Sequence, residues 1–293
     1  MLEQILWTAC VTPFNQDGSK IDYKSFEKIL RMQDETGNGV VIFGSTGESL
    51  SLTENEKKEM LDFVFKLGLK TKIVLGAPSH NLTEALNWID YCNNLPIHGY
   101  LFTTPIYTKP GIMGQTDWFK QILDKSRYPA ILYNIPGRAG IKLHPEAVKN
   151  LENHKNFLAI KDCGGCADSI ISYRIASKKV QVYCGDDYIL PTMATDGAIG
   201  LISIAANAWP SITRKYTQYC LDGGRLPSKL WWQACSALFT ASNPIPIKAL
   251  LKDIGIIEHD TVRLPLSIQD LPSRKTLFNY HEKILNWDPK QEV

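Results

Sequence analysis

The sequence lacks a hydrophobic run long enough to cross a bilayer. A long uncharged stretch, residues 197–213, contains serine, asparagine and proline and falls short of the ~20 apolar residues that a transmembrane helix needs. Residues 1–7 carry an acid where a secretory signal peptide would carry basic side chains. We therefore expect a protein that crosses no membrane and is located in the cytoplasm.

The sequence also lacks an excess of one charge. Its 293 residues include 32 Lys and Arg against 30 Asp and Glu, which gives a net charge of +2 at pH 7, without a block of five or more like charges. Proteins that bind nucleic acid or an anionic membrane usually present a strongly basic surface. We therefore expect neither partner, and the hydrophobic fraction of 44% is ordinary for a globular protein.

The cysteines do not form the pattern of a disulfide framework or a zinc site. They number seven and are widely scattered, so reduced thiols are expected. Cys163 and Cys166 form a C-x-x-C segment, but structural zinc would need a second pair or histidines at ligand spacing. We predict no metal site. A redox role for the pair is the less favoured interpretation, although its oxidation could perturb the nearby Lys161.

Apolar runs rich in Val, Ile and aromatic residues alternate with segments of helical period. The strand-like runs are residues 5–11, 39–44, 72–77, 99–104, 129–135, 157–161, 180–184 and 197–204. The helical segments are residues 22–36, 53–68, 81–93, 115–126, 144–152, 167–177, 188–194 and 208–221. Eight β-then-α units without a linker predict an α/β protein of the (β/α)8 TIM-barrel class. A doubly wound open sheet is the alternative, but a Gly-rich phosphate loop is missing after the first strand.

The alternation stops in the last quarter of the chain. Residues 226–241, 244–253 and 272–286 have helical character with no strand between them. We therefore predict a catalytic barrel over residues 1–224 and a C-terminal all-α appendage over residues 225–293. Two of the barrel helices begin with capping signals, which are Thr53 followed by Glu56, and Asn81 before an amphipathic stretch.

Lys161 stands at the end of the apolar run 157–160, just before Asp162, Cys163 and a Gly pair. The active site of a (β/α)8 barrel lies at the C-terminal ends of its strands. A lysine amine beside low-dielectric walls loses hydration, its pKa falls, and the neutral amine can form a Schiff base with a carbonyl compound. The alternative is a lysine whose stem packs on the strand while its head reaches water. Lys161 taken alone favours that alternative.

Polar side chains at other strand ends favour a catalytic role for Lys161 over a purely structural one. The second strand ends in residues 44–48, Gly-Ser-Thr-Gly-Glu, where glycines let backbone N–H and hydroxyl groups approach a carboxylate. Tyr107 follows the fourth strand, and the fifth runs from Tyr133 into a Gly-flanked loop with Arg138, whose guanidinium suits a carboxylate. Each has an ordinary structural explanation in isolation. Together with Lys161 they suit a carbonyl substrate that bears carboxylates.

These motifs resemble the pyruvate-dependent class I aldolase family of dihydrodipicolinate synthase and N-acetylneuraminate lyase. The matching segments are residues 44–49, 133–140, 160–162, 185–187 and 243–248. Within the family, Arg138 resembles the synthases, whereas Ser45 is also found in the lyases. The resemblance implies a Schiff-base lyase that condenses pyruvate with L-aspartate 4-semialdehyde to 4-hydroxy-tetrahydrodipicolinate on the diaminopimelate and lysine pathway. The alternatives are another pyruvate aldolase, such as N-acetylneuraminate lyase or a keto-deoxy-sugar-acid aldolase, and a non-catalytic barrel.

The resemblance also implies roles for single residues. Lys161 would form a covalent imine with pyruvate, so that no cofactor is needed. Tyr133 would relay protons together with Ser45 and with Tyr107 of a neighbouring subunit. A site completed by another subunit implies a homotetramer built as a dimer of tight dimers. The expected substrate-binding residues are Thr46, Arg138, Gly185 and Ile202.

Feedback inhibition by lysine is expected to be weak or absent. The positions that correspond to the family's lysine site are Ser49, Leu50, Glu54, Lys57, His80, Glu84 and Ile106. Lysine-inhibited members commonly carry histidine, asparagine and tyrosine at several of them. A lysine at position 57 would place a like charge near the ammonium groups of the effector, and this opposes binding.

Overall fold

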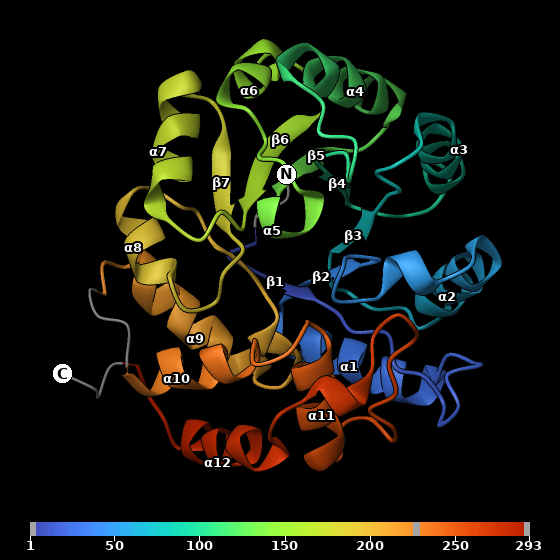
Figure 1. The fold of residues 1–293 in the computed structure, drawn as a ribbon, viewed down its shortest axis with the longest axis vertical. Helices are drawn as coiled ribbons and strands as arrows, with labels where there is room; N and C mark the ends of the chain where they lie inside the picture. Colours follow the sequence, from blue (N-terminus) through green and yellow to red (C-terminus); the bar gives the residue numbers. More distant parts are fainter. Residues whose placement is uncertain (1–3, 225–228, 290–293) are drawn as a thin grey trace. The chain divides into compact units, whose positions relative to one another are not determined.

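Eight parallel strands follow one another in chain order around a closed barrel (Figure 1). The computed structural model describes residues 4–224 and 229–289. The strands are β1 (Leu6–Ala9), β2 (Gly39–Ile42), β3 (Ile73–Gly76), β4 (Gly99–Thr103), β5 (Ala130–Asn134), β6 (Phe157–Asp162), β7 (Gln181–Cys184) and β8 (Leu201–Ser203). The predicted TIM-barrel fold class is confirmed, and every predicted strand is present.

Helices separate the strands and fill the C-terminal part of the chain. They are α1 (Tyr23–Thr36), α2 (Glu54–Lys66), α3 (Leu82–Cys92), α4 (Ile112–Lys125), α5 (Pro136–Ala139), α6 (Pro145–Leu151), α7 (Ala167–Ala176), α8 (Leu190–Thr195), α9 (Pro210–Leu221), α10 (Lys229–Ala237), α11 (Ile245–Asp253) and α12 (Arg274–Leu285). Short 3-10 helices occupy Ser49–Ser51, Ala205–Asn207 and Ile268–Asp270. The predicted C-terminal helices are confirmed, except that residues 226–228 lie outside the described residues.

The chain divides into two compact units, which do not coincide with the predicted domains. One unit comprises residues 72–202, and the other combines residues 4–71 with the C-terminal residues from 203 onward. The second unit therefore contains β1 and β2 as well as α10, α11 and α12. The predicted boundary between residues 224 and 225 stays a prediction.

The unit of residues 72–202 is built on a continuous set of paired parallel strands. In register, Tyr133 of β5 stands beside Lys161 of β6, and Lys161 stands beside Tyr183 of β7. The residues of β4 and β5 are almost completely buried. Helices α3, α4, α6 and α7 lie along the outer side of these strands (Figure 1). The strands that carry Tyr133 and Lys161 are thus paired with each other and covered by helices on their outer side.

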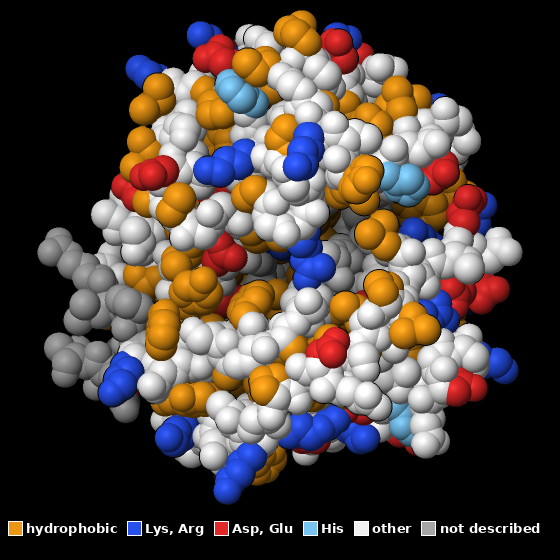
Figure 2. Space-filling view, in the orientation of Figure 1, with side chains coloured by type: hydrophobic (Ala, Val, Ile, Leu, Met, Phe, Trp, Pro, Cys, Tyr) orange, Lys and Arg blue, Asp and Glu red, His pale blue; other side chains and the backbone are white. Residues whose placement is uncertain are grey.

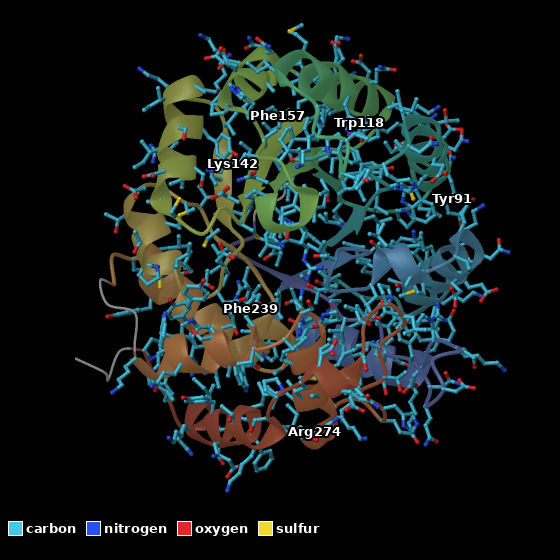
Figure 3. The ribbon with its side chains drawn as sticks, viewed as in Figure 1. Tyr91, Trp118, Lys142, Phe157, Phe239 and Arg274 are labelled. Carbon is cyan, nitrogen blue, oxygen red and sulfur yellow. The ribbon has the colours of Figure 1, made fainter. Side chains whose placement is uncertain are left out.

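The second unit shows why particular residues begin and end its elements. Trp7 of β1 pairs in register with Gly39 of β2, and a Cβ on Gly39 would lie 2.3 Å from the indole ring, so only glycine fits there. Thr53 and Glu56 form the predicted capping box of α2. In the C-terminal part, Arg274 at the start of α12 (Figure 3) forms an ion pair with Asp253 of α11 at 2.8 Å.

Two surface properties complete the description. Among residues 4–224 and 229–289, no helix is both long enough and apolar enough to span a membrane. Acidic and basic side chains are interspersed over the face drawn in Figure 2. This agrees with the near balance of charges in the sequence.

Candidate functional site

Lys161 is buried at the C-terminal end of its strand. It is the last but one residue of β6 and is only 5% exposed. Its Nζ lies 4.4 Å from the centroid of the Tyr133 ring on the neighbouring strand. A lysine that merely reaches into water would keep its ammonium group exposed. The structure therefore places the predicted nucleophile and the predicted proton carrier side by side.

The hydroxyl of Tyr133 also accepts a hydrogen bond from a thiol. Cys163 Sγ lies 3.5 Å from the Tyr133 oxygen. Burial raises the pKa of Tyr133 well above its ordinary value, and the neighbouring Cys163 adds to the shift. Burial likewise raises the pKa of Cys163 to about 12. Both groups therefore keep their protons at neutral pH, and the phenol is available as a proton donor.

A hydrogen-bonded pair fixes the ends of β5 and β6 beside this site. Asn134 Nδ2 donates to Asp162 Oδ1 at 2.6 Å, while Asn134 Oδ1 accepts from the Leu143 N–H at 2.9 Å. The second carboxylate oxygen of Asp162 accepts from the Ser169 hydroxyl. Burial raises the pKa of Asp162, and these hydrogen bonds oppose that shift. The backbone that carries Lys161 is thus held from both neighbouring elements.

Gly185 lies against Lys161 at the end of β7. A Cβ at this position would lie 2.2 Å from Cys163 Sγ and 2.9 Å from Lys161 Cε. Its N–H donates to the carbonyl of Asp162 at 2.7 Å. Gly185 must therefore be glycine, because any side chain would displace the thiol or the lysine stem.

Asp186, the next residue, was not predicted as a site residue. Burial raises its pKa to about 6, the charge of Asp162 adds to this, and Lys161 opposes it. The sequence signals for this position were its place in the family-matching segment 185–187 and the two consecutive acids that follow Gly185. Asp186 is an additional titratable group in the surroundings of Lys161.

Arg138 and Tyr107 lie on two loops that are joined through the backbone. Arg138 is an exposed residue of α5, a single helical turn with Pro136 in its first turn and a left-handed Gly140 after its end. The sequence predicted only a loop here, because one turn is too short to show helical periodicity. The N–H of Tyr107 donates to the carbonyl of Ala139 at 3.3 Å.

The side chain of Tyr107 points away from its own chain. It is 90% exposed, and its backbone has a φ of 67°, which is uncommon for a residue with a Cβ. Ile202, another predicted site residue of this unit, is completely buried in β8. The structure thus groups Lys161, Tyr133 and Gly185, and leaves Tyr107 at the surface.

Ser45 and Thr46 belong to the other unit, in the tight loop after β2. The Gly47 N–H donates to the Gly44 carbonyl, and the Glu48 N–H donates to the Ser45 carbonyl, each at 3.1 Å. Thr46 is 2% exposed. These bonds give the Gly-Ser-Thr-Gly segment one defined conformation.

A side chain from the C-terminal part of the chain contacts this loop. Asn243 Nδ2 donates to Thr46 Oγ1 at 2.9 Å. The sequence suggested Asn243 only as part of a family motif and gave it no role. The two residues are 197 positions apart, so no local pattern could reveal the contact.

The loop ends in a buried ion pair that sequence reasoning also missed. Glu48 Oε1 lies 2.5 Å from Lys248 Nζ, and their side chains are 1% and 0% exposed. Lys248 also donates to the Thr261 carbonyl at 2.7 Å, and the Arg263 N–H donates to Glu48 Oε2 at 2.8 Å. Burial lowers the pKa of Lys248 to about 8, while Glu48 opposes the shift. The pair links α11 to the end of the Ser45 and Thr46 loop.

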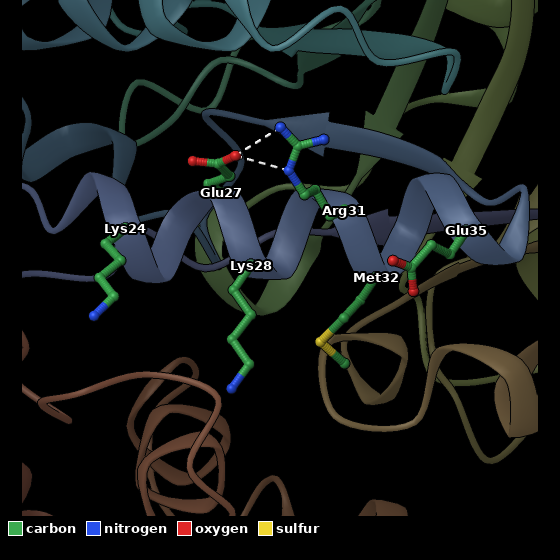
Figure 4. A pocket seen from close by; sticks show the side chains of 6 residues that line it. All are labelled: Lys24, Glu27, Lys28, Arg31, Met32 and Glu35. Atoms are coloured by element: carbon green, nitrogen blue, oxygen red, sulfur yellow. Dashed lines mark hydrogen bonds and ion pairs between the residues drawn. The ribbon is translucent and has the colours of Figure 1, made fainter.

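A hollow on the outer face of α1 lies elsewhere in this unit (Figure 4). Glu27 and Arg31, one turn apart on this helix, form an exposed ion pair at 2.6 Å. Its lining residues, none of which is a predicted site residue, are Lys24, Glu27, Lys28, Arg31, Met32 and Glu35. In the described part of the chain, no cluster of three or more His, Cys, Asp or Glu side chains could hold a metal ion.

Comparison with known proteins gives the family. The model of the dihydrodipicolinate synthetase family matches residues 2–282. The chain belongs to this family. A 4-hydroxy-tetrahydrodipicolinate synthase from Wolbachia pipientis subsp. Culex pipiens (strain wPip) is 56% identical over 287 residues, 98% of each chain. The synthase of that name from Chlamydia pneumoniae is 47% identical over 265 residues, 90% of each chain.

A solved structure from the dihydrodipicolinate synthetase family agrees with the fold. It is the chloride-inhibited dihydrodipicolinate synthase from Acinetobacter baumannii in complex with pyruvate. It has a TM-score of 0.87 and 30% sequence identity, and the match covers 96% of this chain and 98% of that one. The family resemblance inferred from the motifs is therefore confirmed.

Proposed function

We propose that the protein is a 4-hydroxy-tetrahydrodipicolinate synthase, which condenses pyruvate with L-aspartate 4-semialdehyde on the diaminopimelate and lysine pathway. The observation that carries the proposal is the buried Lys161 amine, 4.4 Å from the ring centre of Tyr133 at the end of a barrel strand. The names of the 56% and 47% identical relatives favour the synthase over N-acetylneuraminate lyase or a keto-deoxy-sugar-acid aldolase. A buried amine at this position also argues against a non-catalytic barrel.

Lys161 would act as the nucleophile. Its neutral amine attacks the ketone carbon of pyruvate, and the carbinolamine loses water to give a protonated imine. The imine draws electrons from the pyruvate methyl group, which loses a proton to form an enamine. The enamine carbon attacks the aldehyde carbon, and transimination with cyclisation releases the amine of Lys161.

Tyr133 would carry the protons in these steps. Its raised pKa keeps the phenol protonated, so it can donate to the leaving hydroxyl of the carbinolamine and recover a proton afterwards. Family resemblance assigns the rest of the relay to Ser45 and to Tyr107 of a neighbouring subunit. The exposure of Tyr107 supports its availability to another copy of the chain, and thus the proposed homotetramer. A cytoplasmic location is part of the same proposal.

The remaining assignments concern substrate binding. Thr46 and its backbone N–H would hold the pyruvate carboxylate, and the hydrogen bond from Asn243 supports this by fixing the threonine hydroxyl. Arg138 would receive the carboxylate of the aldehyde through charge-assisted hydrogen bonds. Gly185 and Ile202 would line the pocket, where Gly185 leaves room beside the reacting amine.

Trapping of the imine tests the proposed nucleophile. Pyruvate and borohydride should add one stable, reduced pyruvate adduct to the wild-type chain and none to Lys161→Ala. The matched control is Lys120→Ala, because Lys120 is an exposed lysine paired with Asp124, and this variant should form the adduct normally. Absence of the adduct from the wild type would contradict the Schiff-base mechanism.

A second measurement tests the substrate. Arg138→Ala should lower kcat/KM with aspartate semialdehyde by a factor of roughly 10–150, because a charge-assisted contact contributes about 1.5–3 kcal/mol. Formation of the pyruvate adduct should be unchanged in this variant. Turnover of N-acetylneuraminate by the wild type, without turnover of aspartate semialdehyde, would favour the lyase alternative.

A further inference from the structure

The proposed mechanism leaves the C-x-x-C segment after β6 without a role. Cys163 and Cys166 are separated by two glycines and follow Lys161 closely. Of the seven cysteines, Cys166 is the exposed one and Cys163 is partly exposed, whereas the other five are buried. A thiol reagent in solution therefore reaches Cys166 first.

The backbone between the two cysteines is bent and contains two glycines. The chain bends over residues 164–166, and Gly165 has a φ of 76°. Glycine adopts backbone conformations that other residues avoid, so two glycines between the cysteines allow the chain to fold back and shorten the separation of their Cα atoms. Disulfides span Cα separations of roughly 4.4–6.8 Å. A Cβ on Gly165 would meet no atom within 4 Å, so the bend has open space in which to adjust.

The side chain of Cys166 does not cap α7. It is the N-cap residue of that helix, but its side chain makes no capping hydrogen bond. Its sulfur can therefore change partners without removing a capping bond. The segment is anchored instead by Asp162, which accepts from the Ser169 hydroxyl in the first turn of α7.

The other sulfur lies within the proposed active site. Cys163 donates to the hydroxyl of Tyr133 at 3.5 Å, and it fills the space that a side chain on Gly185 would need, beside the stem of Lys161. A bond from this sulfur to Cys166 would remove the thiol proton that Tyr133 accepts. It would also pull the sulfur away from Gly185 and loosen the packing around Lys161.

We propose that Cys163 and Cys166 form a thiol modification site, at which a low-molecular-weight disulfide installs an internal disulfide and switches off the Schiff-base centre. This inference rests on the proposed function. The Cys166 thiolate attacks one sulfur of the oxidant, which gives a mixed disulfide and releases one thiol. Cys163 gives its proton to solvent and displaces the second thiol. In total, the protein loses two electrons and two protons, and the oxidant is reduced to two thiols.

The second step should be the slower one. Burial raises the pKa of Cys163 to about 12, so little thiolate is present at neutral pH. Formation of the internal disulfide should therefore speed up as pH rises from 7 to 9, as followed by the loss of free thiols.

Oxidised glutathione applied to the full chain tests the switch. The wild type should lose the mass of two hydrogens, its synthase activity should fall about tenfold or more because the proton carrier is disturbed, and dithiothreitol should restore it. Cys166→Ser should keep its mass and activity, because its remaining thiols are buried or partly buried. Cys163→Ser should stop at one glutathione on Cys166.

Several outcomes would overturn the switch. The wild type could keep full activity with the internal disulfide in place, its reaction could stop at the mixed disulfide, or its thiols could fail to react. The Cys166→Ser variant could also be inactivated as fast as the wild type. Failure of the proposed function is distinguishable, because the reduced wild type would then show no activity with pyruvate and aspartate semialdehyde.

Discussion

Removal of Lys248 should destabilise the protein far more than the loss of one surface charge. The substitution Lys248→Met keeps the aliphatic volume and removes the ammonium group, leaving Glu48 with a side chain that is 1% exposed. Breaking a buried ion pair by deleting one partner costs about 3–5 kcal/mol, since the remaining charge is buried without compensation. The Arg263 N–H, 2.8 Å from Glu48 Oε2, would offset only part of this.

The double variant Glu48→Gln/Lys248→Met separates the charge from the packing. The glutamine can still accept the Arg263 N–H, and no charge is left buried. We expect its free energy of unfolding to lie within about 2 kcal/mol of the wild type, because neutral replacement of a buried pair is often tolerated. Lys120→Met is the control for an exposed pair, whose partners are 60% and 52% exposed, and it should change stability by less than ~0.5 kcal/mol.

Urea unfolding at one fixed protein concentration measures these differences. The largest loss is expected in Lys248→Met, because this variant leaves the Glu48 carboxylate buried without a counter-ion. Synthase activity should fall in the same variant, because Glu48 ends the loop that presents Thr46. A loss below about 1 kcal/mol in Lys248→Met, or a double variant no more stable than the single one, would refute the reasoning.

Three further predictions concern other parts of the molecule. Gly185→Ala should lower kcat by roughly a hundredfold, because its Cβ would displace the reacting amine. The control Gly111→Ala, where a Cβ meets no atom within 4 Å, should leave kcat unchanged. Equal kcat values for the two variants would contradict the packing argument. The Arg263 partner lowers the pKa of Glu56 to about 2, so this pair stabilises the fold by about 1–3 kcal/mol before solvent screening. The stabilisation is fully present above pH 4.5 and is lost as the pH falls toward 2. In thermal unfolding, Glu56→Gln should remove this contribution to the loss of stability in acid. Lysine at millimolar concentration should inhibit the enzyme weakly, because Lys57 repels its ammonium groups; strong inhibition below millimolar lysine would count against this.

The fold was predictable because its signals are local. Hydrophobic periodicity located every strand, and side-chain capping marked the starts of α2 and α3, where Asn81 Oδ1 accepts from the Glu84 N–H at 3.1 Å. The short helix α5 escaped prediction, since a single turn has no period to detect. The position of Lys161 at a strand end was also readable, because a charged residue directly after an apolar run stands out in the sequence.

The surroundings of these residues were not predictable in the same way. Lys161 could equally have reached into water; its burial beside Tyr133 depends on the register between two parallel strands, which the sequence of either strand does not specify. The contact of Asn243 with Thr46 and the pairing of Glu48 with Lys248 join residues 197 and 200 positions apart. Neither follows a periodic pattern.

The sequence by itself thus determined the order of strands and helices, the family and the chemical types at the strand ends. All of these are written in short windows of the chain. The tertiary structure alone decided which lysine head is buried, which thiol meets the phenol of Tyr133, and why residue 185 has no room for a side chain. These properties arise from packing, in which distance in space replaces distance along the chain.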